Sequence, residues 1–246
     1  MNRFILVALL ALTVSPALVS AGDTGTDILE NSCSSCHDLK GPAPQTIHAL
    51  WKRDAPDLFY AGNKFQREWL IEWLQKPVRI RPAGVNYLRT INSTPINQDV
   101  SKKGRKYDVL WGEVLKPLKH VTLNKDNAEA VADALMQLTP NNDLTAEMAL
   151  DDAQDVDLDS GELLIDKVYG CLSCHQIEPG YGGYTGAELY TAGKRLQAEY
   201  MLSYIKRPKN WDPKIWMPNG NVKPDDLQKI ANYLILLSKE DFNASN

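Results

Sequence analysis

The chain has 246 residues, of which 43% are hydrophobic and 24% are charged, a composition typical of a globular protein. The formal net charge of −4 argues against a nucleic-acid-binding protein, because such proteins carry a basic surface. The acidic excess lies in the second half, where residues 143–160 read as an acidic linker.

Residues 1–21 have the layout of a secretory signal peptide. Arg3 precedes an apolar run from Phe4 to Val14, and small residues lead up to Ala21. The run is too short to cross a bilayer, which takes ~20 apolar residues. We therefore expect a periplasmic or otherwise exported protein with no membrane span in its mature chain.

All four cysteines fall in two C-x-x-C-H motifs, made of Cys33, Cys36 and His37, and of Cys171, Cys174 and His175. In this motif the two thiols bond to the vinyl groups of a haem and the adjacent histidine supplies an axial nitrogen to the iron. A structural zinc site, a redox-active dithiol and structural disulfides also use cysteine pairs. A histidine directly after both pairs favours two covalently bound haem c groups over these alternatives.

A repeated segment follows each motif, since residues 58–77 align without gaps on 189–208. Bulky residues recur at helical spacing in both copies, which predicts a central helix that Pro77 and Pro208 end. Residues 125–138 and 223–237 form a second pair and predict a closing helix in each half.

Two details concern how the closing helices begin. Asp126 and Glu129 are expected to form a capping box, and Pro224 is expected in the first helical turn.

These elements predict an all-α fold of two tandem helical domains with long loops. The first domain would span residues 22–142, with an insertion at about 85–119, and the second 161–246.

The motifs and the repeat resemble class I c-type cytochrome domains, and nearly the whole mature chain is similar to a dihaem cytochrome c. In that family a Pro-x-Leu segment packs by the proximal histidine, and the resemblance gives this role to Pro56 and Leu58. The second copy retains only Leu189. The resemblance also makes Lys64 and Arg195 candidates for binding haem propionates, with plain surface charge as the alternative.

The resemblance implies a methionine on the loop before the closing helix as the distal iron ligand. Met217 lies there in the second half, whereas Met201 is expected in the core. In the first half Asn86 aligns with Met217 and is a poor iron ligand. We expect His120, which lies just before the closing helix, to replace it. The alternatives are His48, Met136 and an iron without a protein ligand on that side.

The resemblance implies electron transfer between a donor and an acceptor protein, by a free carrier or by a subunit of a larger respiratory or oxidoreductase complex. A bis-histidine first haem would have the lower potential, because the methionine thioether raises the potential of the second. The alternative is a dihaem enzyme, peroxidase-like or oxidising sulfur compounds, with one haem as the reaction site. No further cysteine is available as a thiolate ligand, which argues against the sulfur-oxidising site.

Overall fold

The computed structural model describes residues 21–53, 55–78, 80, 120–151, 156–183 and 185–242. Most of these residues are helical, which confirms the prediction of a mainly α-helical protein. The described part also holds one short antiparallel hairpin that the sequence did not predict, β1 (Gln176–Glu178) and β2 (Tyr181–Gly182). Gly180 makes its turn possible, because its φ of 89° is a conformation that glycine adopts readily.

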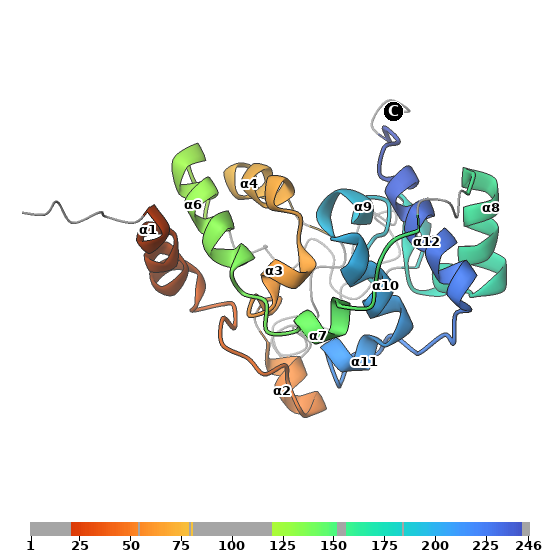
Figure 1. The fold of residues 1–246 in the computed structure, drawn as a ribbon, viewed down its shortest axis with the longest axis horizontal. Coiled ribbons are helices and arrows are strands. Elements are labelled where there is room, and N and C mark those ends of the chain that lie inside the picture. Colours follow the sequence, from red (N-terminus) through yellow and green to blue (C-terminus); the bar gives the residue numbers. More distant parts are fainter. Residues whose placement is uncertain are drawn as a thin grey trace, which may run out of the picture.

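The helices of the first half lie at the left of Figure 1, where α1, α3 and α4 gather around α6, and α2 lies apart at the bottom. They are α1 (Ala21–Ile28), continued by the π-helical turn η1 (Leu29–Cys33), α2 (Ile47–Lys52), α3 (Ala61–Lys64), α4 (Arg67–Gln75) and α6 (Lys125–Met136). Both α1 and α4 pack along α6. Leu29, Leu70 and Val131 are buried where these helices meet, so this half has an apolar core of its own.

The helices of the second half gather around α12, at the right of Figure 1. They are α8 (Leu158–Leu163), continued by the π-helical turn η4 (Leu164–Val168), the 3-10 turn η5 (Cys171–Ser173), α9 (Ala192–Arg195), α10 (Ala198–Lys206), α11 (Pro208–Trp211) and α12 (Pro224–Leu237). Helices α8, α9 and α10 all pack on α12. Met201 is 3% exposed inside this core, as predicted.

The ends of the repeated helices follow the prolines. Helices α4 and α10 end at residues 75 and 206, shortly before Pro77 and Pro208, and α12 begins at Pro224, as predicted. The predicted capping box is wrong. Asn124 caps α6 instead, with its side chain accepting a hydrogen bond from the Asn127 amide at 2.9 Å, because the helix begins before Asp126.

The two halves join through a bridge between equivalent positions of the repeat. Phe65 and Leu196 pair as an isolated antiparallel β-bridge. The flanking backbone hydrogen bonds are reciprocal, from the Gln66 amide to the Arg195 carbonyl at 2.8 Å and from the Gln197 amide to the Lys64 carbonyl at 2.9 Å. Because each side donates to and accepts from the other at equivalent positions, the two sides of the contact are related by an approximate two-fold axis.

The side chains of the two aligned glutamines repeat the same exchange. The Gln66 amide group donates to the carbonyls of Gly193 and Leu196 at 2.7 and 2.9 Å. The Gln197 amide group donates to the carbonyls of Gly62 and Phe65 at 2.7 and 2.8 Å. Each glutamine therefore satisfies two backbone acceptors of the opposite half.

Aromatic rings and a shared arginine extend this contact. Tyr60 of the first half lies against Tyr200 and Trp211 of the second, with ring centroids 6.3 and 5.5 Å apart. The Arg53 guanidinium bonds Asp57 at 2.8 Å and Asp212 at 3.3 Å, and both carboxylates are almost fully buried. The contact between the halves thus combines apolar packing with a buried ion-pair network.

The acidic linker runs between the halves and partly packs on the second. It includes most of the short helix α7 (Asn142–Thr145), and the α8 cap at Asp157 lies near its end. Its Met148 and Leu150 pack against a buried cluster of Leu202, Leu227 and Ala231. These apolar contacts fix the path of the linker up to Leu150.

Several sequence predictions concern residues outside the described part. They are the signal peptide apart from Ala21, the insertion at about 85–119, and Asn86 within it. Within the described ranges, every helix is too short or too polar to span a membrane.

Replacing Gln66 or Gln197 with alanine should lower the free energy of unfolding by similar amounts. Each change leaves two partly buried carbonyls without their donor, which costs about 1–2 kcal/mol. The double variant should cost less than the sum, because both residues serve one interface. Gln75→Ala is the control, since this amide donates only within its own helix, to the Ile71 carbonyl. Denaturant unfolding checks the result, and equal effects of all three changes would contradict the bridge.

Candidate functional site

The two C-x-x-C-H motifs form the same tight turn. The Cys33 carbonyl accepts the amides of Cys36 and His37 at 3.1 and 3.0 Å. The Cys171 carbonyl accepts those of Cys174 and His175 at 3.1 and 2.9 Å. Both turns follow directly on a helical segment packed into its own core. Each half thus holds two thiols and an imidazole in the same mutual arrangement.

The first thiol of each pair has a raised pKa. Burial raises the pKa of Cys33 and of Cys171, and the second cysteine of each pair raises it further. A redox-active dithiol needs the opposite shift, because it depends on a thiolate. Among the described residues, no three His, Cys, Asp or Glu side chains gather as a metal site. These pKa shifts argue against a redox-active dithiol at either turn.

A backbone carbonyl orients each motif histidine. His37 Nδ1 lies 2.7 Å from the Pro56 oxygen, and His175 Nδ1 lies 2.6 Å from the Ala187 oxygen. An Nδ1–H that donates to a carbonyl leaves the Nε2 lone pair for a metal. Burial lowers the pKa of both histidines, which keeps the imidazoles neutral, as ligation requires. The aligned segments "APDL" and "GAEL" thus place the same carbonyl beside each histidine.

The rings of His120 and His37 lie close together. Their ring centroids are 6.2 Å apart, and His120 Nδ1 lies 2.8 Å from the Val121 oxygen, which again leaves Nε2 available. With a metal–nitrogen bond of about 2 Å and a ring nitrogen about 1.2 Å from its centroid, two imidazoles on opposite sides of one metal have centroids about 6.3 Å apart. The observed centroid spacing is close to this value, so His37 and His120 are the residues that would hold a metal between them.

The rival residues in the first half lie elsewhere. His48 is exposed on α2, and Met136 lies in α6 against the apolar core. Among the described aromatic contacts of His37, the partner ring is that of His120. The structure therefore brings His37, Pro56 and His120 together and leaves His48 apart.

The second site differs from the first around its histidine. Gly186 lies directly on the His175 ring, where an added Cβ would come within 2.4 Å of Cε1, 2.6 Å of Nδ1 and 2.7 Å of Nε2. Met217 is half-buried between α11 and α12, beside Trp216, which is 75% exposed. Among the described residues no contact joins Met217 to His175. The sequence pattern alone therefore supports Met217 as a ligand.

Lys64 and Arg195 lie at the contact between the halves rather than on open surface. Arg195 is 6% exposed, and its guanidinium donates to Thr191 Oγ1 at 2.7 Å and to the Glu188 carbonyl at 3.0 Å. Lys64 Nζ lies 4.9–5.7 Å from the ring centroids of Phe65, Tyr60 and Tyr200. Burial, followed by the charges of Arg195 and Arg53, lowers the pKa of Lys64 to about 8. Arg195 already pairs with the buried Glu188 carboxylate at 3.6 Å, whereas a carboxylate group placed near Lys64 would favour its charged form.

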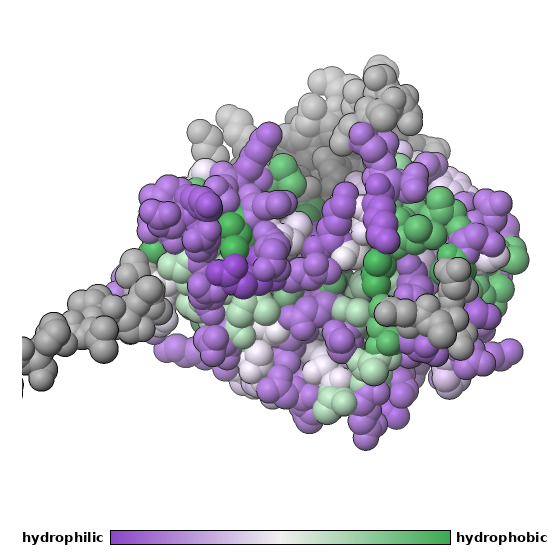
Figure 2. All heavy atoms as spheres, turned by 45° about the horizontal axis from the view of Figure 1, so that its top comes forward, coloured by the Kyte–Doolittle hydropathy of each residue, from purple (hydrophilic) through white to green (hydrophobic). Residues whose placement is uncertain are grey.

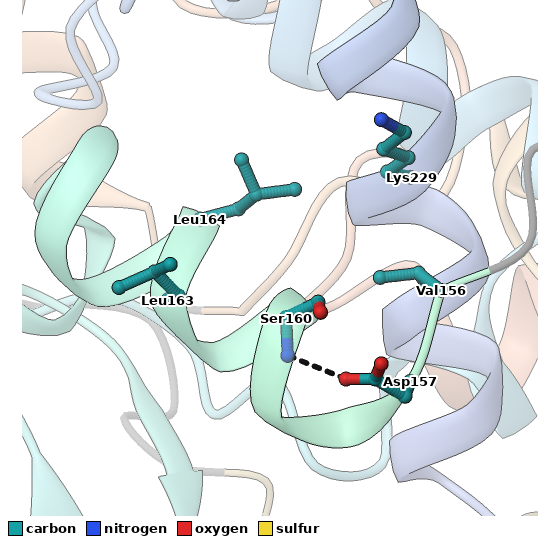
Figure 3. Close-up of a pocket in the computed structure, with 6 residues that line it drawn as sticks. All are labelled: Val156, Asp157, Ser160, Leu163, Leu164 and Lys229. Atoms are coloured by element: carbon teal, nitrogen blue, oxygen red, sulfur yellow. Dashed lines mark hydrogen bonds between the residues drawn. The ribbon is translucent and has the colours of Figure 1, made fainter.

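A surface hollow of 420 Å³ lies between α8 and α12 (Figure 3). Val156, Leu163, Leu164 and Lys229 line it, together with Asp157, which accepts the Ser160 amide at 2.7 Å to cap α8. No histidine or cysteine lines this hollow, so it lacks the chemistry of the two turns. The face of the molecule in Figure 2 is mainly hydrophilic, and apolar side chains gather toward the end that holds α8 and α12.

Comparisons with models of protein families, with curated proteins and with solved structures find no match for this chain.

Proposed function

We propose that this protein is an exported dihaem cytochrome c that transfers electrons between a donor and an acceptor protein. The observation that carries the proposal is the opposed pair His37 and His120, with centroids 6.2 Å apart and each Nδ1 held by a backbone carbonyl. His37 belongs to a C-x-x-C-H turn, and the second half repeats this turn with the same carbonyl contact at His175. One covalently bound haem at each C-x-x-C-H turn would account for the repetition of this arrangement in the two halves.

Each haem would supply one-electron transfer at its iron, and the chain would set the conditions for it. Thioethers to Cys33 and Cys36, and to Cys171 and Cys174, would tether the groups. His37 and His120 would hold the first iron through Nε2, and His175 and Met217 the second. Two imidazoles give the lower potential and a thioether raises the other, so electrons would enter at the first site and leave from the second.

The buried cations would bind the propionate groups of the two haems. Lys64 and Arg195 occupy equivalent positions of the repeat, and each lies beside the bridge that joins the halves. A cation near an iron stabilises its reduced form, because reduction lowers the positive charge there. Lys64 and Arg195 would therefore hold the propionate groups and raise both reduction potentials.

The mature protein, made in a host that attaches haem to C-x-x-C-H motifs, should have the mass of the processed polypeptide plus two haems. Intact mass spectrometry and a pyridine haemochrome assay test this count. Cys33→Ser with Cys36→Ser should remove one haem, and the same pair of changes at Cys171 and Cys174 should remove the other. A bare polypeptide mass without a Soret band would overturn the proposal.

A further inference from the structure

The His120 ring packs against an indole at the end of α4. The centroids of His120 and Trp73 are 4.5 Å apart and their planes meet at 69°, so the rings pack edge to face. Such aromatic pairs are worth about 0.5–1.5 kcal/mol beyond their burial. Among the described residues, the ring partners of His120 are Trp73 and His37. Trp73 therefore supports the imidazole that lies opposite His37.

The indole is itself fixed by the backbone. Trp73 Nε1 donates to the Val78 carbonyl at 2.8 Å, across the turn that Pro77 makes after α4. The segment that carries His120 returns to the same place, since the Leu123 amide donates to the Leu74 carbonyl at 3.0 Å. His120 is thus attached to the last turn of α4 through a backbone hydrogen bond nearby and through its own ring.

A row of aromatic rings connects this support to the contact between the halves. The centroids of Phe65 and Trp69 are 5.4 Å apart, and those of Trp69 and Trp73 are 5.8 Å apart. Phe65 is buried and forms the β-bridge to Leu196. The position of Trp73 therefore depends on packing that begins at the interface.

The residue that aligns with Trp73 in the second half makes different contacts, so the repeat does not explain the indole of Trp73. Tyr204 aligns with Trp73, and its ring lies 5.3 Å from that of Tyr200, among the aromatic residues where the halves meet. The aligned residue therefore serves the interface in the second half, whereas Trp73 faces a histidine in the first.

We propose that Trp73 is a positioning residue that holds His120 in the orientation needed to bind the first iron and slows its dissociation. The inference rests on the proposed function, because it assigns a role toward a haem bound at His37. The indole blocks rotation of the imidazole, so that less side-chain freedom is lost when the ligand bond forms. His120 Nδ1 keeps its carbonyl contact, and Trp73 touches only the ring.

The test measures ligand exchange in the holoprotein with Trp73→Ala and Trp73→Phe. Carbon monoxide should bind the reduced first haem roughly fivefold to tenfold faster in Trp73→Ala than in wild type, because one ring contact is lost. The low-temperature paramagnetic resonance signal of a bis-imidazole haem should weaken or shift. Trp73→Phe keeps a ring and loses the Nε1 donor, so its rate should lie between the two.

Trp69→Ala is the matched comparison, because it removes an indole of the same size from the same helix but one that reaches His120 only through Trp73, so its effect on the rate should be smaller. The positioning role would be overturned if Trp69→Ala and Trp73→Ala had equal rates. It would also be overturned if both Trp73 variants bound carbon monoxide at the wild-type rate. A wild-type protein with two haems but no bis-imidazole signal would instead overturn the His120 assignment. A protein without haem would overturn the proposed function as a whole.

Discussion

Replacing His120 with alanine is expected to leave both haems attached while opening one iron to external ligands. The thioethers and His37 do not depend on His120, so haem attachment should persist. The first iron would lose its sixth ligand, become high-spin and bind carbon monoxide or cyanide rapidly, while the second stays unchanged. Optical and paramagnetic resonance spectra, together with a haemochrome count, measure these effects.

Two further variants test whether this effect is specific to His120. His48→Ala should behave as wild type, because His48 is exposed on α2 and, among the described aromatic contacts of His37, the partner ring is that of His120. His120→Met should restore a closed site and raise the lower of the two potentials by on the order of 0.1 V, since axial ligands move haem potentials over roughly 0.8 V. Unchanged spectra in His120→Ala, or an opened site in His48→Ala, would refute the assignment of His120.

Replacing Gly186 with valine should disrupt the second site selectively. A Cβ at this position would come within 2.4 Å of the His175 ring, so the imidazole must move away from the Ala187 carbonyl. Overpacking of this kind costs about 1–3 kcal/mol. We expect a less stable protein in which the second haem is attached but weakly ligated by His175, while the first keeps its bis-imidazole signal.

Gly220→Val is the control for this change. A Cβ at Gly220 would meet only the Val222 side chain, at an ordinary contact distance of 3.5 Å. It lies on the same loop as Met217 but does not crowd His175. A second haem that remains normal in Gly186→Val, or one that is equally disturbed by Gly220→Val, would show that the close approach of Gly186 has no role.

The sequence predicted the features that depend on local pattern. Pro77, Pro208 and Pro224 mark helix ends because proline lacks an amide donor and has a fixed φ. The cysteine spacing predicted two equivalent haem-attachment sites, and the distance from His120 to its closing helix predicted that His120 is the distal ligand; both stay predictions, although the structure places the His120 and His37 rings 6.2 Å apart. The hairpin after Cys174 escaped prediction because its strands are too short to show an alternating pattern.

The contact between the halves could not be derived from local pattern. Gln66 and Gln197 are identical in the aligned segments, which was the available signal, but their partners lie more than 100 residues away in the chain. Arg53 bridges Asp57 and Asp212 only because the fold brings them together. The role of Trp73 was hidden for the same reason, since a bulky residue at helical spacing usually fills a core.

The reciprocal bridge has a consequence for how such a chain could arise. Each half carries both the donors and the acceptors of the contact, so a shorter polypeptide with one half would be self-complementary and two copies would pair isologously. Joining two such genes end to end would keep the pairing while letting the copies diverge. One half could then acquire its distal histidine while the corresponding position of the other half stayed unchanged.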